Sequence, residues 1–253
     1  MTRTGPALDR HVSHLRRKGR DWGRALDALR RLTANKEDTA QVYAIMNALN
    51  GNAYEVDYVR LLSTPEGGRI AYERVELADK LMDQALRASF PRGSVGAAYV
   101  EFLETEHISV QGLIDESHKG IPPAELDQHH PYVWFFRRFR DIHDILHVLT
   151  GYGRDSLGEI CLLAFSYQET HDLGRAVMAY GGFVRAHGPA KSQARKAIME
   201  ARRRGNRAVW LPGEDFEKLL FEPLDAARER LGLTPPTAYE AVPPELRNLT
   251  MDS

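Results

Sequence analysis

Two histidines and a carboxylate fall within five consecutive residues near the middle of the chain. Residues 143–147 read His-Asp-Ile-Leu-His, and Glu159 follows after eleven more residues. On a helix, which turns by about 100° per residue, His147 lies about 40° and Asp144 about 100° from His143, so one turn offers all three side chains to a common point. Imidazoles and carboxylates are ligands for zinc, iron and manganese, and carboxylates also suit magnesium. The spacing therefore indicates a site for one divalent metal ion and leaves the metal open.

Each of these residues also has an ordinary structural explanation. A histidine pair four residues apart can be a packed or hydrogen-bonded core pair, and Asp144 can be a solvated helix residue. Glu159 ends the sequence Ser-Leu-Gly-Glu, in which Ser156 would cap a helix while the glutamate bonds back to the amide of the capping residue. Spacing alone does not decide between these roles and metal binding.

Two consecutive helices must position the motif. Pro131 suits the first turn of a helix over residues 132–150, which we expect to stop at Gly-Tyr-Gly over residues 151–153. A second helix should begin near Ser156. So short a connection predicts an antiparallel helical hairpin, which would bring Glu159 close to the end of the first helix.

Helical patterns also dominate the rest of the chain, and we find no convincing period-2 strand, internal repeat or low-complexity tract. The predicted fold is all-α, a single-domain multi-helix bundle with the metal motif on a central helical hairpin. No Ser/Gly-rich or Pro-rich linker divides it. We expect further helices over residues 38–49, 77–88, 94–103 and 214–231 and one from Pro189, a turn at residues 64–68, and a loop-like tail after Pro236.

The composition is that of a globular protein. The 253 residues carry a formal net charge of -1, and 27% are charged against 43% hydrophobic, which argues against a disordered or membrane-spanning chain. No run approaches the roughly 18 to 20 apolar residues of a spanning helix. The single cysteine, Cys161, excludes an intramolecular disulfide and a thiol-only metal site, and it favours a reducing compartment.

Positive charge is concentrated in the first 36 residues, which hold ten lysines and arginines against three aspartates, a net charge of about +7. Trp22, Leu26 and Leu29 form one apolar stripe on a helix there. We favour a helix packed on the domain with a solvated basic face. A basic helix resting on anionic lipid and an organellar transit peptide are the alternatives. Nucleic-acid binding is not expected, because the charge is confined to one end and no nucleic-acid module accompanies it.

The metal motif extends into a longer signature. Residues 138–151 read Arg-Phe-Arg-Asp-Ile-His-Asp-Ile-Leu-His-Val-Leu-Thr-Gly, and residues 157–160 read Leu-Gly-Glu-Ile. This combination resembles the hallmark of the Coq-four family of ubiquinone (coenzyme Q) biosynthesis, His-Asp-x-x-His with a glutamate after eleven residues. Further similarity lies at residues 64–70, 90–99, 221–224 and 231–233. We therefore expect a basic N-terminal arm over 1–22, a Coq-four-like helical domain over 23–235 and a loop-like tail over 236–253.

Position by position, the resemblance implies that His143, Asp144, His147 and Glu159 are metal ligands. The metal of this family is usually assigned as zinc. Iron, manganese and magnesium are the alternatives. The implied protein is a metal-dependent decarboxylase, which is a lyase. It would remove the C1 carboxylate of a polyprenylated 4-hydroxybenzoate. In an oxidative form of the reaction, this decarboxylation is coupled to hydroxylation at C1. Arg140 matches the family's Arg-x-Arg and is our candidate for orienting the substrate carboxylate; a bond to Asp144 or Glu159 is its alternative role.

The resemblance also implies partners and a location. The expected ligand is a polyprenylated benzoquinone precursor, the expected partners are other ubiquinone-biosynthesis proteins, and homo-oligomers stay open. The chain would be peripheral to a membrane, on the cytoplasmic side of the inner membrane in a bacterium or on the matrix side of the mitochondrial inner membrane in a eukaryote. The alternative function is a non-catalytic lipid-binding scaffold that organises the biosynthetic enzymes, with a purely structural metal. A metal hydrolase of the His-Asp type is disfavoured, because we find no persuasive further His and Asp ligands in separate helices.

Overall fold

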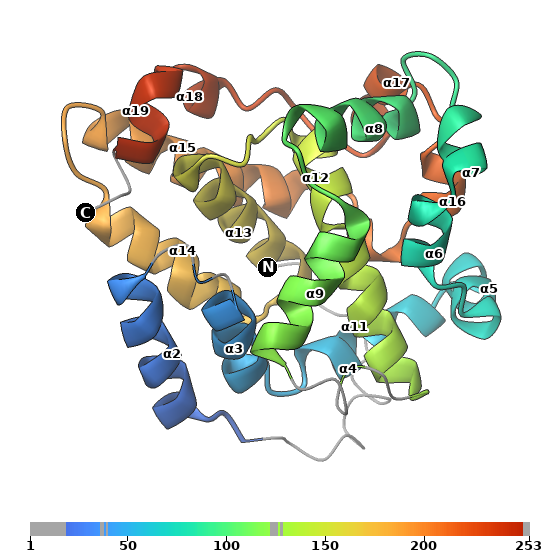
Figure 1. Cartoon of the computed structure of the whole chain (residues 1–253), viewed down its shortest axis with the longest axis horizontal. Coiled ribbons are helices and arrows are strands. Elements are labelled where there is room, and N and C mark those ends of the chain that lie inside the picture. The colour runs from blue at the N-terminus through green and yellow to red at the C-terminus, as the bar shows by residue number, and fades with distance from the viewer. Residues whose placement is uncertain (1–18, 36–37, 39, 122–125, 127–128, 250–253) are drawn as a thin grey trace. The chain divides into compact units, whose positions relative to one another are not determined.

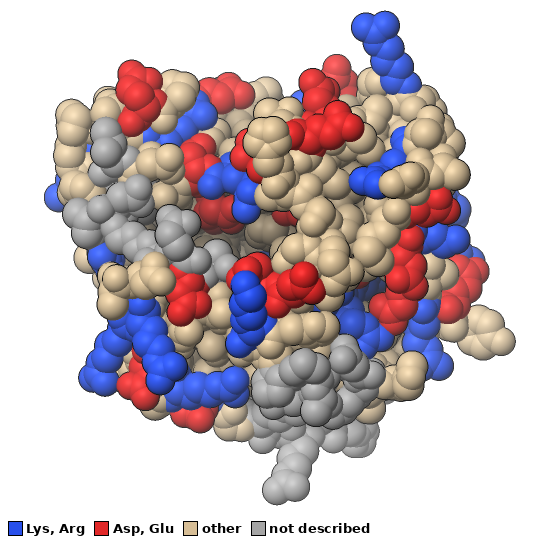
Figure 2. Space-filling view, viewed as in Figure 1, with Lys and Arg blue, Asp and Glu red and all other residues tan. Residues whose placement is uncertain are grey.

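The structure is a computed structural model that describes residues 19–35, 38, 40–121, 126 and 129–249. Within these residues every regular element is a helix, and the sole β-type pairing is an isolated bridge between Ser94 and Pro223 (Figure 1). Basic and acidic side chains are interspersed on the face seen in Figure 2, in keeping with a net charge near zero. The predicted all-α class is confirmed.

Contacts within the chain group it into two compact units, each assembled from separate stretches of sequence. The first unit comprises Met1–Met82, Ser109–Asp141 and Pro212–Asp215, and the second comprises Asp83–Ile108, Ile142–Leu211 and Phe216–Ser253. The boundaries expected for a helical domain over 23–235 and its two flanking segments stay a prediction.

The first unit contains seven described α-helices. Helix α2 contacts α3 and buries Ala25 and Ala28, whereas Trp22 and Leu26 are each about half exposed. The apolar stripe predicted to pack is therefore only partly buried, because the small alanines form the contact face. Residues 1–18 of the predicted basic arm lie outside the described residues. The helices are α2 (Trp22–Ala34), α3 (Ala40–Leu49), α4 (Ala53–Leu62), α5 (Pro65–Glu73), α6 (Leu77–Met82), α9 (Val110–Gly120) and α11 (Pro131–Asp141).

The turn predicted at residues 64–68 is wrong. Thr64 accepts a hydrogen bond from the Gly67 amide at 3.0 Å, and Pro65 occupies the first helical position of α5. Thr at the N-cap followed by Pro is a helix start signal, which here outweighs the glycines that follow.

The second unit contains ten described α-helices. The helix predicted from 94 to 103 is present as α8, and Ser94 caps it through the Ala97 amide. The helices are α7 (Gln84–Ala88), α8 (Val95–Thr105), α12 (His143–Thr150), α13 (Ser156–Thr170), α14 (Leu173–Arg185), α15 (Lys191–Arg207), α16 (Phe216–Leu219), α17 (Leu224–Arg230), α18 (Thr237–Glu240) and α19 (Pro244–Leu249).

The helix predicted over residues 132–150 is interrupted at Ile142. Helix α11 ends at Asp141 and α12 begins at His143, so the break coincides with the boundary between the two units. No proline or glycine marks this position. A tertiary hydrogen bond lies there instead, because the Asp141 carboxylate accepts from the Ala78 amide at 3.2 Å, beside a bond from its neighbour Arg140.

The helix predicted over residues 214–231 is also divided, into α16 and α17. Between them the carbonyl groups of Leu220 and Glu222 accept hydrogen bonds from the Gly96 and Val95 amides. Pro223, which cannot donate a hydrogen bond within a helix, lies at the start of α17.

The described part of the segment after Pro236, residues 237–249, is not loop-like. It forms α18 and α19, and Tyr239 and Val242 are buried. Both helices are too short to show a helical period, which is why the sequence pattern missed them.

Helices α13 and α15 approach closely through small residues. Ala194, Ala197 and Ala201 are fully buried on one side of α15. Gly205 continues that row, and a Cβ added to it would lie 2.4 Å from the Phe165 carbonyl oxygen of α13.

Gly205→Ala should therefore destabilise the second unit by about 1–3 kcal/mol, because the new methyl group overpacks a rigid backbone contact. The measurement is thermal unfolding, with an expected drop in Tm of a few degrees. Gly181→Ala is the matched control, since a Cβ there meets nothing within 4 Å and alanine favours a helix. Equal Tm values for the two variants would show that this close approach is not rigid.

Candidate metal centre

The four predicted ligands come from two consecutive helices of the second unit. On α12, the ligand atoms of His143, Asp144 and His147 lie within 4.8 Å of one another. The two Nε2 atoms of the histidines are 3.3 Å apart. Glu159, in the first turn of α13, places Oε1 3.4 Å from His147 Nε2 and Oε2 3.7 Å from His143 Nε2. The structure thus gathers three candidates on one helix and directs the fourth at both imidazoles.

These separations fit a single bound ion. Two ligands held tetrahedrally at 2.0–2.1 Å from zinc are about 3.3 Å apart. The 3.3 Å between imidazole nitrogens and the 3.4 Å from Glu159 to His147 agree with that value. The donor set of imidazole nitrogen and carboxylate oxygen fits zinc, iron or manganese.

The orientation of His147 is fixed by a backbone carbonyl. His147 Nδ1 lies 3.0 Å from the carbonyl oxygen of Tyr152. A carbonyl oxygen accepts hydrogen bonds and cannot donate them, so Nδ1 carries a proton. In neutral His147 the lone pair is then on Nε2, the atom that faces His143 and Glu159. This is the arrangement in which a histidine binds a metal ion.

Burial and mutual charge set the protonation of the site. Burial raises the pKa of Glu159, but the charge and hydrogen bond of His147, aided by His143, lower it to about 2. Burial lowers the pKa of His147, yet Glu159 and the Tyr152 carbonyl together raise it. Burial and the neighbouring His147 lower the pKa of His143. The site therefore holds a carboxylate anion beside a neutral His143.

The connection between α12 and α13 determines where Glu159 lies. Gly151 ends α12 in the left-handed conformation, with φ 77°, and its amide donates to the His147 carbonyl at 2.9 Å. Asp155 then caps α13 by accepting from the Gly158 amide at 2.9 Å. The capping box considered from the sequence is wrong, because the N-cap is Asp155 rather than Ser156.

Tyr239 of α18 anchors this connection. Its hydroxyl donates to the Asp155 carboxylate and accepts from the Gly153 amide at 3.0 Å. Arg247 lies over the Tyr239 ring and also donates to its hydroxyl at 3.2 Å. No sequence pattern points to Tyr239, because it lies 84 residues beyond the Asp155 carboxylate that it binds.

Two arginines bind the end of α12. Arg228 donates to the carbonyls of Leu149 and Val148 at 3.1 and 2.8 Å, and Arg204 donates to that of Thr150 at 2.8 Å. The last carbonyls of a helix lack partners within it and carry partial negative charge. The two arginines supply hydrogen-bond donors to these carbonyls and positive charge beside them. They therefore stabilise the short helix α12, which bears three of the candidate ligands.

Residues 28–237 match the family model described as "Coenzyme Q (ubiquinone) biosynthesis protein Coq4". The chain belongs to this family. Its members are ubiquinone biosynthesis proteins, and the resemblance noted in the sequence is confirmed.

Named relatives show the same similarity. The mitochondrial ubiquinone biosynthesis protein COQ4 homolog of Rattus norvegicus is 28% identical over 182 residues, which cover 69% of this chain and 63% of the relative. Ubiquinone biosynthesis protein COQ4, mitochondrial, of Komagataella phaffii is 27% identical over 195 residues, covering 75% and 58%. The chain thus spans less than two thirds of the length of these relatives.

A solved structure supports the fold. A crystal structure of a protein from Nostoc punctiforme superimposes with a TM-score of 0.63 at 20% identity, covering 85% of this chain and 100% of that one. Within the described part of this Coq4-family chain, no helix has the length and apolar character needed to cross a bilayer.

Arg140, the predicted orienting residue, lies in the first unit. Its Nε and Nη2 donate to the Asp141 carboxylate at 2.9 and 2.7 Å, and its Nη1 donates to the Ser117 hydroxyl at 3.2 Å. The helical wheel that placed Arg140 beside the ligands assumed an unbroken helix, and the break at Ile142 removes that argument. Its role in the Coq4-family site stays a prediction.

Gly158→Ala should weaken metal binding by this chain. A Cβ at Gly158 would lie 2.0 Å from the Gly153 carbonyl oxygen, so the connection must move away from α13 and shift Glu159. We expect a loss of about tenfold or more in metal affinity, as for other changes to groups that orient ligands. Competition with a chromophoric chelator measures it, and Gly181→Ala is again the control. Unchanged affinity in Gly158→Ala would mean that Glu159 does not depend on this turn.

Proposed function

We propose that this chain is a metal-dependent enzyme of ubiquinone biosynthesis that removes the C1 carboxylate of a polyprenylated 4-hydroxybenzoate intermediate. The observation that carries the proposal is the convergence of His143, His147 and Glu159 at separations that suit one ion, in a family of ubiquinone biosynthesis proteins. We include Asp144 as the fourth ligand because its carboxylate lies within 4.8 Å of the ligand atoms of His143 and His147.

The proposed reaction breaks the bond between ring carbon C1 and the carboxyl carbon and releases carbon dioxide. In the oxidative form, one oxygen atom of dioxygen becomes the hydroxyl oxygen on C1. Two electrons and two protons from a donor reduce the other oxygen atom to water. This balance is written for the substrate as the carboxylic acid. In the simple form a proton replaces the carboxylate. A bound metal would supply Lewis acidity for either form.

The metal distinguishes these two forms. Zinc, our first choice, has no redox chemistry and suits the simple decarboxylation. Iron or manganese at the same ligands would suit the oxidative form.

The protein side chains of the site divide into a closed side and an open side. The His147 side chain is fully buried, and the Phe102 ring stacks on it with ring centroids 5.6 Å apart. His143 and Glu159 each keep about a third of their side-chain surface exposed, 33% and 35%. Substrate would therefore approach from the side of His143 and Glu159. Because Glu159 has a pKa of about 2, it serves as a negative ligand rather than a proton donor near neutral pH.

We also propose that Arg140 orients the substrate carboxylate. Its bonds to Asp141 are charge-assisted and strong, whereas its bond to the neutral Ser117 hydroxyl is weaker. This role rests on the match of Arg140 to the family's Arg-x-Arg, because Arg140 lies in the first unit and the metal ligands lie in the second.

The proposed location and partners follow the relatives. The proteins from Rattus norvegicus and Komagataella phaffii are named mitochondrial. We propose a peripheral position at the membrane of quinone synthesis, on the matrix side in a eukaryote or on the cytoplasmic side in a bacterium, beside other ubiquinone-biosynthesis proteins.

Elemental analysis of the purified protein tests the ligands. We expect about one metal ion per chain, and loss of most of it in His143→Ala, His147→Ala and Glu159→Ala, because each change removes a donor from a site of at most four. His129→Ala and Glu101→Ala are matched controls, since both residues are exposed and lie outside the cluster. Full metal retention by the ligand variants would contradict the assignment of the metal site. A metal-free wild type after gentle purification would contradict it as well.

An activity assay separates the enzyme from the scaffold alternative. Metal-loaded protein supplied with the polyprenyl hydroxybenzoate, oxygen and an electron donor should release carbon dioxide. His147→Ala should abolish this release, and Arg140→Lys should raise KM more than it lowers kcat, because lysine keeps the charge but loses the planar donor pair. If metal-loaded wild type never converts the substrate, while the metal variants lose thermal stability, the metal is structural and the scaffold function is favoured.

A further inference from the structure

The C-terminal helix α19 contacts α13, whose first turn carries Glu159. The side-chain oxygen Oδ1 of Asn248 accepts a hydrogen bond from the Ser156 amide at 2.8 Å. Ser156 is the first residue of α13, and the first amides of a helix have no partner within that helix. Helix α19 therefore satisfies one of these amides from a position 92 residues further along the chain.

Arg247 provides a second attachment between α19 and this turn. Its guanidinium lies 4.2 Å from the centre of the Tyr239 ring, and its Nη1 lies 4.0 Å from the Asp155 carboxylate. The side chains of Arg247 and Asp155 are only 18% and 17% exposed, so solvent screens their attraction less than at an open surface. Burial and the bond to Asp155 raise the pKa of Tyr239, so its hydroxyl keeps the proton that it donates to Asp155. Arg247 thus holds the Asp155 carboxylate both directly and through Tyr239.

Asp155 connects these contacts to the metal centre. Its carboxylate accepts from the Gly158 amide at 2.9 Å, and its backbone carbonyl accepts from the Glu159 amide at 3.0 Å. A shift of Asp155 would therefore move the backbone of Glu159 directly. The carboxylate of Glu159 lies 3.4 Å from His147, so a displacement of less than an ångström would change the separation between two candidate ligands.

Tyr239 also contacts the other side of the same connection. Its ring meets the Tyr152 ring edge-on, with centroids 5.4 Å apart, and the Tyr152 carbonyl is the group that orients His147. The ring of Tyr239 therefore lies between Tyr152, which orients one ligand, and Arg247, which lies over the ring. Both ligand-bearing sides of the connection are thus joined to α18 and α19.

We propose that α19 is a clamp on the metal centre, in which Arg247 and Asn248 are positioning residues that keep the Glu159 carboxylate directed at the two histidines. They act through Asp155 and Ser156, as groups that orient ligands do in other metal sites. The clamp rests on the proposed metal-dependent function. It extends the centre to residues after 237, where the match to the family model ends.

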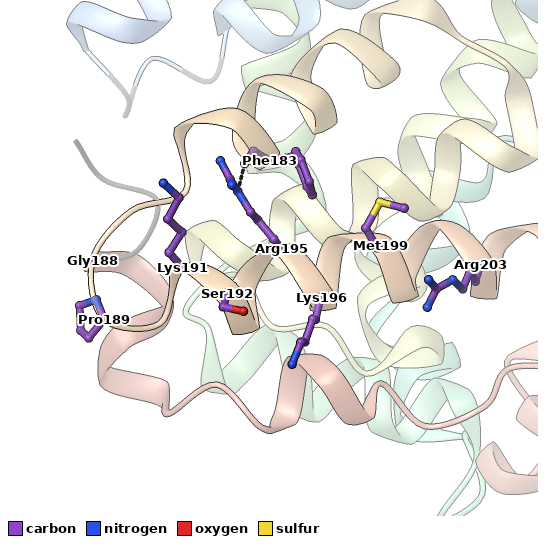
Figure 3. A pocket seen from close by; sticks show the side chains of 9 residues that line it. All are labelled: Phe183, Gly188, Pro189, Lys191, Ser192, Arg195, Lys196, Met199 and Arg203. Atoms are coloured by element: carbon purple, nitrogen blue, oxygen red, sulfur yellow. Dashed lines mark hydrogen bonds between the residues drawn. The ribbon is translucent and has the colours of Figure 1, made fainter.

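Arg195 of α15 makes the same kinds of contact away from the metal centre and supplies a matched control. Its Nε donates to the Phe183 carbonyl at 2.9 Å, and its guanidinium lies 5.0 Å from the centre of the Phe183 ring (Figure 3). Arg247 likewise donates from Nε to the Val242 carbonyl at 2.9 Å. Both arginines are partly buried. Arg195→Met and Arg247→Met therefore remove similar contacts, but only Arg247 is bonded to the turn that carries a ligand.

The first measurement is hydrogen exchange at the Gly158 and Glu159 amides, in the full chain with and without added zinc. We expect exchange to be faster by about tenfold in Arg247→Met and by about threefold in Asn248→Ala, and by less than about twofold in Arg195→Met. Asn248→Asp keeps an acceptor oxygen at the start of α13 and should exchange at nearly the wild-type rate. Because Asn248 is exposed, its variants should fold even if Arg247→Met does not.

The second measurement is the rate at which zinc passes from the loaded protein to a chromophoric chelator. We expect zinc loss to be roughly tenfold faster in Arg247→Met and within about twofold of the wild-type rate in Arg195→Met and Asn248→Asp. Equal rates for the two arginine variants in both measurements would overturn the clamp and leave the metal centre intact. If the wild type binds no zinc, the proposed metal centre fails, and the exchange rates alone then decide whether Arg247 and Asn248 hold the turn.

Discussion

The hydrogen bond between His147 Nδ1 and the Tyr152 carbonyl is the constraint on which the metal centre depends. It places the proton of neutral His147 on Nδ1 and presents Nε2 to His143 and Glu159. The carbonyl is available because Gly151 adopts a positive φ and turns the chain back at the end of α12. The turn that ends the helix thus also determines the chemistry of a ligand within it.

Support for that turn comes from distant parts of the second unit. Tyr239 binds Asp155 and Gly153, and Arg204 and Arg228 bind the last carbonyls of α12. A two-turn helix has little stability alone, because its nucleation cost is spread over few hydrogen bonds. Buried polar contacts made by other helices therefore hold the ligands at their separations.

The sequence predicted the parts of this arrangement that are local. The spacing of His143 and His147 predicted that they share one face of a helix. The glycines after Thr150 predicted where that helix ends, and the short connection that follows predicted that Glu159 lies close to this end. The break at Ile142 could not be predicted, because it coincides with tertiary bonds of Asp141 rather than with a helix-breaking residue. Arg204 and Arg228 were missed because an arginine that binds a distant carbonyl looks the same in sequence as a solvated one.

The order of these residues along the chain has a consequence for biosynthesis. All four ligand candidates are made by residue 159, but Arg204, Arg228 and Tyr239, which fix the end of α12 and the turn after it, are made later. A nascent chain that has just emerged past α13 therefore contains the whole motif without the groups that align it. The groups that align the motif are complete only after Tyr239 has been made, so we expect a metal ion to meet the described geometry only after α18 has been synthesised.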